Sequence, residues 1–366
     1  MNRALTTWLP SYLARSRRWV PAACTDILFC LCDHFEPFHG TTAPGARERL
    51  RRWALDYPTL ARDFKDADGR HPRPTFFYPI EQYDQGAVQS LADLAHAGWG
   101  EVELHLHHER DTAETLSCTL LAGVERLARH GLLARDSLGK IRYAFVHGNW
   151  ALDNSHPDGR HCGVNTELAV LKNTGCYADF TLPSAPDPTQ TRLINSLYYA
   201  ADTPTPKSHD QGEPVRVKST GCRTAGEDPR LLLVQGPLGL NWRRRKWGCL
   251  PRIENGELAG NNPPSETRLR LWLDLHIHVR GRPEWVFVKL HTHGCDEERG
   301  NMAMLLGEPM KTFYQLLTRA YNDGRTYRLH FVTAREMVNI LHAAEDGHTG
   351  SPGLYRDYRY QWKPAP

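Results

Sequence analysis

The sequence lacks any long hydrophobic run. Its most apolar stretch, residues 27–32, contains six residues, whereas a helix needs about 20 to cross a bilayer. We therefore expect no integral membrane span. Near the N-terminus Pro10 interrupts the apolar residues, so this segment does not have the continuous apolar core of an export signal.

A strong excess of charge of one sign is also missing. The chain has 45 Lys and Arg residues against 42 Asp and Glu residues, which gives a net charge of +3. This balance is too mild to indicate a nucleic-acid partner. The basic cluster at residues 242–247 is interpreted as a solvated turn, with contact to phosphate groups left open as an alternative. We therefore expect no binding of nucleic acid.

A disulfide framework is not indicated either. The nine cysteines are odd in number and scattered, and several lie inside apolar runs. This pattern favours free thiols in the cytoplasm over a secreted, cross-linked protein. With 40 % hydrophobic and 24 % charged residues the composition is that of an ordinary globular protein. Nothing in it indicates an oligomeric state.

Short apolar runs alternate with stretches of helical periodicity. This order is typical of parallel βαβ units, and it leaves an α/β barrel or a doubly wound sheet open. Residues 1–366 are expected to form one domain with an irregular insertion at about 183–280, in which residues 266–279 favour a strand but allow a helix. The expected strands are residues 26–32, 74–80, 101–107, 141–147, 177–182, 285–293 and 327–332. The expected helices are residues 46–65 with a break at Pro58, 87–97, 114–130, 165–173, 309–321 and 334–342.

Nineteen histidines are the unusual feature of the composition. Many of them lie in four polar clusters that each follow an expected strand. Because the carboxyl ends of parallel strands open on one face of an α/β fold, these clusters are expected to form one site. The clusters are Asp33, His34 and Glu36; His105, His107, His108 and Glu109; His147, Asn149, Trp150 and Asp153; and His291 and His293.

Alternation along two strands sharpens this prediction. In residues 101–107 the aliphatic side chains share one face, while Glu103, His105 and His107 share the other. The apolar face is expected to pack on helices and the histidines to point into a barrel or cleft. Lys289, His291 and His293 share a face in the same way.

Two histidines at i and i+2 on a strand can both reach one metal ion, and imidazole suits Zn, Fe, Ni or Cu. A carboxylate such as Asp33 or Glu109 would complete the set and leave one position open for water. Simpler explanations stay open for single residues: a lone pair of such histidines can be structural, Asp33 can cap the next helix, and Trp150 can be core packing.

At these residues the chain resembles the polysaccharide deacetylases of the NodB-homology fold, carbohydrate esterase family 4. The first motif of that family ends in two aspartates, a general base and a metal ligand, and Asp33 and His34 match them. Its second motif has two ligand histidines four residues apart. His105 and Glu109 match these two positions, with His107 between them.

A late motif of the family supplies a histidine that acts as an acid, and His291 matches it. The third, arginine-containing motif has no match, and residues 147–150 occupy its place in the order. The resemblance spans roughly residues 25–335, interrupted by residues 183–280.

The resemblance implies a distorted (β/α)7 barrel and a metal-dependent hydrolase, a deacetylase of an N-acetylated or otherwise acylated sugar or glycan precursor. The implied cofactor is a divalent metal ion, usually Zn. It implies Asp33 as base and His291 as acid. The expected metal ligands are His34, His105, His107 and Glu109. The residues expected to contact substrate are His147, Asn149, Trp150 and His293.

Two other functions stay open. An amidohydrolase or phosphoesterase would also use histidines at i and i+2, but usually on its first strand. One metal ion per chain would favour the deacetylase, and two or three would favour the phosphoesterase. The remaining alternative is a catalytically inactive barrel that binds a glycan, which the loss of the family's ligand aspartate supports.

Overall fold

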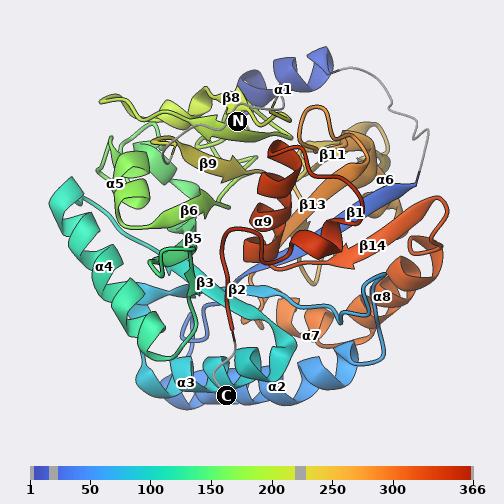
Figure 1. Ribbon diagram of the computed structural model, residues 1–366, viewed down its shortest axis with the longest axis horizontal. Coiled ribbons are helices and arrows are strands. Elements are labelled where there is room, and N and C mark those ends of the chain that lie inside the picture. The colour runs from blue at the N-terminus through green and yellow to red at the C-terminus, as the bar shows by residue number, and fades with distance from the viewer. Residues whose placement is uncertain (1–3, 16–23, 219–227, 364–366) are drawn as a thin grey trace.

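The computed structural model describes residues 4–15, 24–218 and 228–363 (Figure 1). Its main feature is a 12-stranded sheet with the order β12-β13-β1-β2-β3-β5-β6-β9-β7-β8, in which β14 also pairs with β1 and β4 with β5. The strands are β1 (Thr25–His34), β2 (Thr75–Pro79), β3 (Glu101–Leu106), β4 (Ala134–Arg135), β5 (Ile141–His147), β6 (Cys176–Asp179), β7 (Leu197–Ala200), β8 (Glu213–Pro214), β9 (Leu231–Val234), β12 (Glu257–Leu258), β13 (Trp285–Thr292) and β14 (Tyr327–Phe331).

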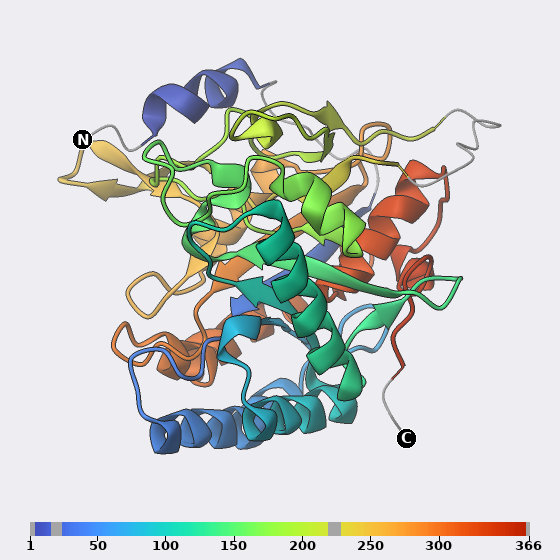
Figure 2. The ribbon, with the colours of Figure 1, turned by 90° about the vertical axis from the view of Figure 1, so that its left-hand side faces the viewer.

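Helices cover the sheet on its outer side. Figure 1 shows α2, α3, α4 and α8 along the periphery of the molecule, and Figure 2 shows α4 from the side. The helices are α1 (Leu5–Ala14), α2 (Ala43–Ala61), α3 (Gln85–Leu94), α4 (Ala113–Arg129), α5 (Glu167–Asn173), α6 (Glu266–Leu275), α7 (Asn301–Leu305), α8 (Glu308–Ala320) and α9 (Ala334–Glu345). No helix among the described residues is long and apolar enough to cross a membrane.

The expected α/β class is confirmed. Strands β13, β1, β2, β3, β5, β6 and β9 pair in parallel, and β7 and β8 continue the sheet in antiparallel direction. Strand β14 is parallel to the first half of β1, and β2 pairs with the second half. Within the described residues the backbone pairing leaves the two ends of the sheet unjoined.

A side chain nevertheless connects β13, next to one end of the sheet, with the segment that follows β6. Lys289 on β13 donates from Nζ to the carbonyl oxygens of Phe180 and Leu182, which follow β6, at 2.5 and 3.2 Å. The sheet is therefore curved enough to bring β13 opposite β6.

The hydrophobic core has two layers, one on each face of this curved sheet. The outer layer joins Leu104 and Leu106 of β3 to the peripheral helices. The inner layer joins Leu28 of β1 to Met337 and Leu341 of α9. Every residue of α9 is buried, and Figure 1 shows this helix at the centre of the molecule. The inner face is thus closed by α9, and polar side chains remain at the carboxyl ends of the strands.

Two expectations about single elements were wrong. Helix α2 continues through Pro58 because Tyr57 and Ala61 on either side of it pack into the core. Residues 266–275 form a helix, α6, rather than a strand. The Ser265 hydroxyl accepts the N–H of Arg268 as an N-cap, and the side chains at positions 269, 272 and 275 are buried.

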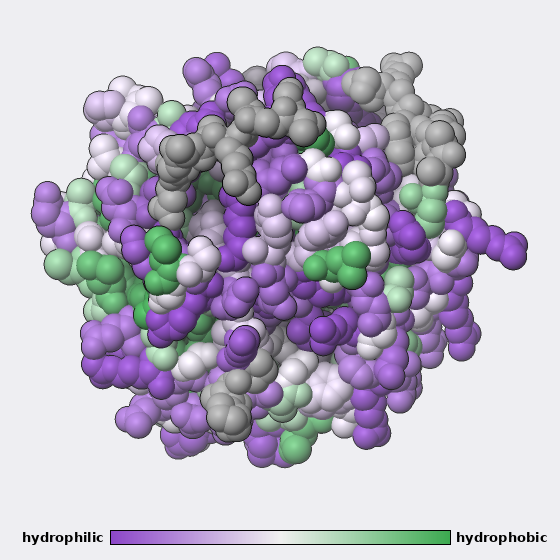
Figure 3. All heavy atoms as spheres, viewed as in Figure 1, coloured by the Kyte–Doolittle hydropathy of each residue, from purple (hydrophilic) through white to green (hydrophobic). Residues whose placement is uncertain are grey.

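The expected insertion is also more regular than its composition suggests. It supplies β7, β8 and β9 to the main sheet, together with a separate hairpin of β10 (Gly239–Lys246) and β11 (Leu250–Glu254). Figure 2 shows this hairpin extending from the body of the molecule. Its exposed residues include Trp242 and Trp247, which lie in the basic cluster of residues 242–247. Figure 3, viewed as in Figure 1, shows a largely hydrophilic face with small separate groups of hydrophobic residues.

Candidate metal centre

A small cavity lies where the carboxyl ends of β1, β3, β5 and β13 meet. Its volume is about 290 Å³. The side chains around it come from the loops that directly follow these four strands, as the positions of the polar clusters predict. The lining residues are His34, Glu36, His39, His107, Asn149, Trp150, His293, Cys295, Asp296 and Arg299.

Glu36, His105 and His107 form the tightest group at this cavity. The Glu36 Oε1 atom lies 2.9 Å from Nε2 of His105 and 3.2 Å from Nε2 of His107. His105 is fully buried, and the side chains of Glu36 and His107 are 9 % and 30 % exposed. One atom from each of the three residues therefore points at the same small volume, next to the cavity.

The other ring nitrogen of each histidine has an oxygen partner. His105 Nδ1 lies 2.9 Å from the carbonyl oxygen of Val146, and His107 Nδ1 lies 2.8 Å from Oε1 of Glu81. Because both partners are acceptors, both Nδ1 atoms carry a proton, so Nε2 is the atom of each ring that a cation beside Glu36 could use. Histidines that bind a metal ion are held in this way, with the second ring nitrogen donating to a carbonyl or carboxylate.

The ionisation of the group follows from these contacts. Burial acts to raise the pKa of Glu36, but hydrogen bonds with His105 and His107 outweigh it and hold the pKa well below its usual range. Burial acts to lower the pKa of His107, but hydrogen bonds with Glu36 and Glu81 outweigh it and raise the pKa to about 9. Without a cation, hydrogen bonds between the two imidazole rings and the Glu36 carboxylate therefore hold this group together.

A divalent ion can take the place of these protons. Two imidazoles and one glutamate form a donor set that catalytic zinc sites use, and also the donor set of many non-haem Fe(II) sites. The residues therefore fit a divalent metal ion.

Three further histidines lie beside this group. The ring centroid of His34 is 5.0 Å from that of His105, 4.7 Å from that of His293 and 6.0 Å from that of His291. Burial lowers the pKa of all three, so their rings are neutral at neutral pH. His34 Nε2 and His293 Nδ1 have no hydrogen-bond partner among the residues described. His34 and His293 line the cavity, whereas His291 lies among buried side chains.

Gly148 allows His107 its position. A Cβ atom added at Gly148 would lie 2.3 Å from Cδ2 of the His107 ring, which is far inside van der Waals contact. The ring therefore lies directly on the backbone that follows β5.

Asp33 does not reach the cavity, which differs from its expected role as the base. Alternation along β1 turns its side chain to the opposite face from His34, next to Trp53 of α2. There it is fully buried, and Oδ1 accepts the N–H of Gly294 at 2.6 Å. Burial raises its pKa to about 8. His291, the expected acid, is not among the residues that line the cavity, whereas His293, two residues further along the chain, is.

The structure does not bring Glu109 to the group either. Its carboxylate is 49 % exposed and lies 3.9 Å from Nδ1 of His161. The β3 strand ends at Leu106, so the chain has already turned away from the sheet at position 109. Glu36 takes the place expected for this carboxylate.

The residues expected to contact substrate divide into two sets. Asn149, Trp150 and His293 line the cavity, and the Trp150 ring meets the His293 ring edge to face with centroids 6.4 Å apart. Asn149 and Trp150 both have a φ of 55°, a left-handed conformation that only a tightly turned loop requires. His147 is fully buried and does not belong to the cavity lining in the described part of the chain.

Two carboxylates were missed at the sequence level. Glu36 belongs to the first polar cluster but was not among the expected ligands, because it lies two residues beyond the end of β1. Glu81 lies in a short helical turn after β2, and nothing in its sequence surroundings marks it. Its proximity to His107 depends on how two separate strand ends are placed in space.

The chain was also compared with known proteins. No protein-family model, no curated protein and no solved structure matches it.

Proposed function

We propose that the chain is a metal-dependent hydrolase whose Glu36, His105 and His107 hold one divalent ion, with zinc the ion best suited to them. The observation that carries this proposal is the convergence of two Nε2 atoms on one carboxylate oxygen, while both Nδ1 atoms donate to other oxygens. A merely structural pair of histidines has no need of that arrangement.

The ion supplies Lewis acidity when bound, which activates water and polarises a carbonyl group. His34 and His293 supply proton transfer, since both line the cavity as neutral rings. Each also has a buried ring nitrogen without a partner in the described residues. A neutral imidazole accepts a proton from the attacking water and returns it to the leaving group.

We propose an acylated sugar, with an N-acetyl group as the bond cleaved, as the substrate class. Trp150 offers an indole ring at the cavity wall, and Asn149, Asp296 and Arg299 offer hydrogen-bonding groups for hydroxyls. A volume of about 290 Å³ is at the small end of ligand pockets and suits one sugar ring or its acyl group.

This assignment agrees with the seven parallel strands in the order β13-β1-β2-β3-β5-β6-β9. We interpret them as a distorted (β/α)7 barrel that is open between β9 and β13. The Lys289 bridge to the segment after β6 supports this interpretation.

The test is acetate release from N-acetylated saccharides and nucleotide sugars by the purified chain. We expect activity that chelation abolishes and Zn or a similar divalent ion restores. His105→Ala and His107→Ala should lose both the ion and the activity, whereas His293→Gln should keep the ion and lose about 10²–10⁴ in kcat/KM. His71→Ala is the control, because His71 packs against Trp99 at the amino ends of the strands.

Three results would contradict the proposal. Release of phosphate from phosphate esters, with no acetate release, would assign the site to a phosphoesterase. Tight glycan binding with the ion fully bound and no turnover would assign the chain to the inactive barrels. Unchanged metal content in both His105→Ala and His107→Ala would place the ion elsewhere.

A further inference from the structure

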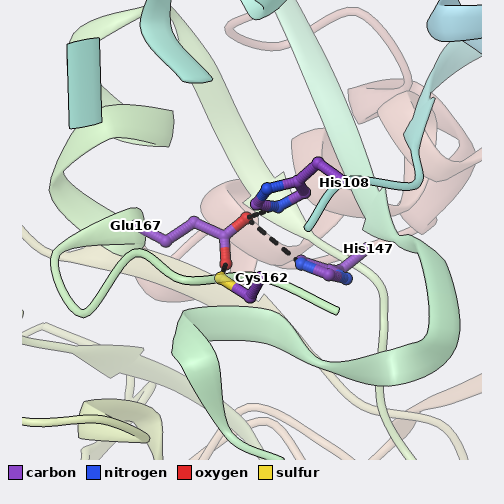
Figure 4. Close-up of side chains that lie close together, drawn as sticks. All are labelled: His108, His147, Cys162 and Glu167. Atoms are coloured by element: carbon purple, nitrogen blue, oxygen red, sulfur yellow. Dashed lines mark hydrogen bonds and ion pairs between the residues drawn. The ribbon is translucent and has the colours of Figure 1, made fainter. Parts of the chain in front are cut away.

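A second group of possible metal ligands lies beside the cavity. It consists of His108, His147, Cys162 and Glu167, which Figure 4 shows pointing toward one another. One ligand atom from each of the four lies within 4.8 Å of the other three. The residues come from the loop after β3, the end of β5, the following long loop and the first residue of α5.

The spacing of these atoms fits a tetrahedral ion. Glu167 Oε1 lies 3.2 Å from His108 Nε2 and 3.6 Å from His147 Nε2, and Glu167 Oε2 lies 3.4 Å from Cys162 Sγ. Zinc bonds of about 2.0–2.3 Å in tetrahedral geometry place neighbouring ligand atoms about 3.3–3.8 Å apart. A small contraction around an ion would bring all four atoms into bonding range.

The two histidines are oriented as ligands. His147 Nδ1 contacts the carbonyl oxygen of Gly148, and His108 Nδ1 lies 3.0 Å from Oδ2 of Asp111. His147 Nδ1 therefore has an acceptor, whereas His108 Nδ1 lies close to Asp111 without forming a hydrogen bond in the described residues. The Nε2 atoms of both rings face Glu167. Glu167 is itself fixed, because its Oε2 accepts the N–H of Asp153 at 2.6 Å.

His147 provides an independent indication of a ligand. It is fully buried, and its Nε2 has no hydrogen-bond partner in the described residues. Buried polar atoms are rarely left without a partner, because losing the hydrogen bonds of water costs free energy. A cation at the centre of the group gives this nitrogen its partner.

The group is closed to solvent, unlike the cavity site. The side chains of His108, His147 and Glu167 are 4 %, 0 % and 0 % exposed, and Cys162 is 0 % exposed. Four protein ligands and no access for water are typical of structural zinc sites. Catalytic sites keep one position open, as the group around Glu36 does at the cavity.

We propose that His108, His147, Cys162 and Glu167 bind a structural zinc ion that is separate from the ion at Glu36. The ion joins the ends of β3 and β5 to the start of α5, and it fixes the loop that carries Asn149 and Trp150 into the cavity wall. The chain then holds two ions in sites of different kinds. A count of two metal ions per chain therefore no longer favours a phosphoesterase over a deacetylase.

The test uses the thiolate as a reporter. X-ray absorption at the zinc edge of the purified full chain averages over both zinc ions. It should therefore show one sulfur ligand for every two zinc ions, bound to only one of them. Replacement of zinc by Co²⁺ should produce a sulfur-to-metal charge-transfer absorption. Cys162→Ser should abolish that absorption, and His105→Ala should keep it. Cys176→Ser is the matched control, since Cys176 is equally buried on β6.

The possible results separate this proposal from the proposed function. No sulfur ligand in the zinc or cobalt protein, or a charge-transfer absorption that survives Cys162→Ser, would overturn the second centre. The measurements on the wild-type chain decide the question even where Cys162→Ser does not fold. A sulfur-bound ion together with unchanged metal content in His105→Ala and His107→Ala would support the second centre and contradict the site at Glu36.

Discussion

Glu81 holds one of the proposed ligands in place without being within reach of the ion itself. Its Oε1 accepts the Nδ1 proton of His107 at 2.8 Å, which fixes the ring and makes Nε2 a better donor. Loss of such a supporting carboxylate typically weakens metal binding 10- to 100-fold. We therefore expect Glu81→Ala to weaken zinc binding at the cavity by about that factor, as measured by competition with a chelating dye.

Glu48→Ala provides the control for this prediction. Glu48 lies on α2, where its carboxylate pairs with Arg51 on the surface. Zinc affinity in this variant should equal that of the wild-type chain. Equal affinities in Glu81→Ala and Glu48→Ala would mean that His107 is not a ligand or does not need its carboxylate partner.

Asp33 makes stability depend on pH. Burial raises its pKa from 3.8 to about 8 in the folded protein, so folding favours the neutral carboxyl. The unfolded chain ionises at about pH 4, and the wild-type protein therefore loses stability as the pH rises from about 4 to about 8. The loss is at most about 1.4 kcal/mol per pH unit.

Asp33→Asn removes this ionisation and keeps an oxygen for the N–H of Gly294. The free energy of unfolding of the variant, relative to that of the wild type, should rise between pH 4 and pH 8 and then level off. Urea unfolding at several pH values measures it. A pH-independent difference between the two proteins would mean that Asp33 is ionised in the folded state.

At the scale of elements, the strand ends decide whether the ligands meet. Gly148 follows β5 directly, and a Cβ there would lie 2.3 Å from the His107 ring. Its φ lies outside the left-handed region, so its own backbone conformation suits alanine, but the added Cβ would press on the ring of His107 and lie 2.9 Å from its Cα atom. We expect Gly148→Ala to weaken zinc binding at least tenfold, although no ligand is removed.

Gly86→Ala is the matched variant for this experiment. Gly86 lies in the first turn of α3, and its nearest neighbour to an added Cβ is Asp84 Oδ1 at 3.4 Å, an ordinary contact. Zinc affinity should be unchanged in Gly86→Ala. Full zinc affinity in Gly148→Ala would show that the His107 ring can move without losing the ion.

Helices and strands whose apolar residues recur at one clear spacing could be predicted from the sequence, and those without such a spacing could not. Alternation in β3 correctly separates Leu104 and Leu106, which face the helices, from His105, which faces the cavity. Residues 266–275 show why this method is limited. Their apolar positions fit both the helical period of 3.6 residues and the strand period of two. The N-cap at Ser265 and the burial of Trp272 belong to a helix.

The partners of the histidines depend on loops, which have no such period. Glu36 and Glu109 each follow a strand that ends in histidine-rich sequence, and only the path of the chain after the strand brings one carboxylate to His105. The same holds for Cys162 and Glu167, which approach His147 because the loop after β5 folds back on the sheet. Sequence reasoning could therefore locate the site but not complete its ligand set.

At the scale of the whole molecule, the sequence does not predict the positions of α9 and of the insertion. Periodicity predicts the α9 helix but not its place on the inner face, where its apolar residues meet β1. The insertion has the composition of a loop, yet it extends the sheet by β7, β8 and β9. These strands continue the sheet past β6, and a Cβ added at Gly236, just after β9, would lie 2.5 Å from the carbonyl oxygen of Lys289 on β13.

Lys289 connects β13 with the segment after β6, and its removal tests how the sheet is curved. The side chain is fully buried and donates to two carbonyl oxygens after β6. Lys289→Met keeps the length of the side chain but leaves the Phe180 carbonyl without its donor, at a cost of about 1–3 kcal/mol, whereas the Leu182 carbonyl keeps the N–H of Gly236. We expect a corresponding fall in the free energy of unfolding, measured in urea.

Lys311→Met is the control. Lys311 forms an exposed ion pair with Glu308 on α8, so this variant should change the free energy of unfolding by less than about 1 kcal/mol. Equal stability of the two variants would mean that backbone packing alone holds β13 opposite β6.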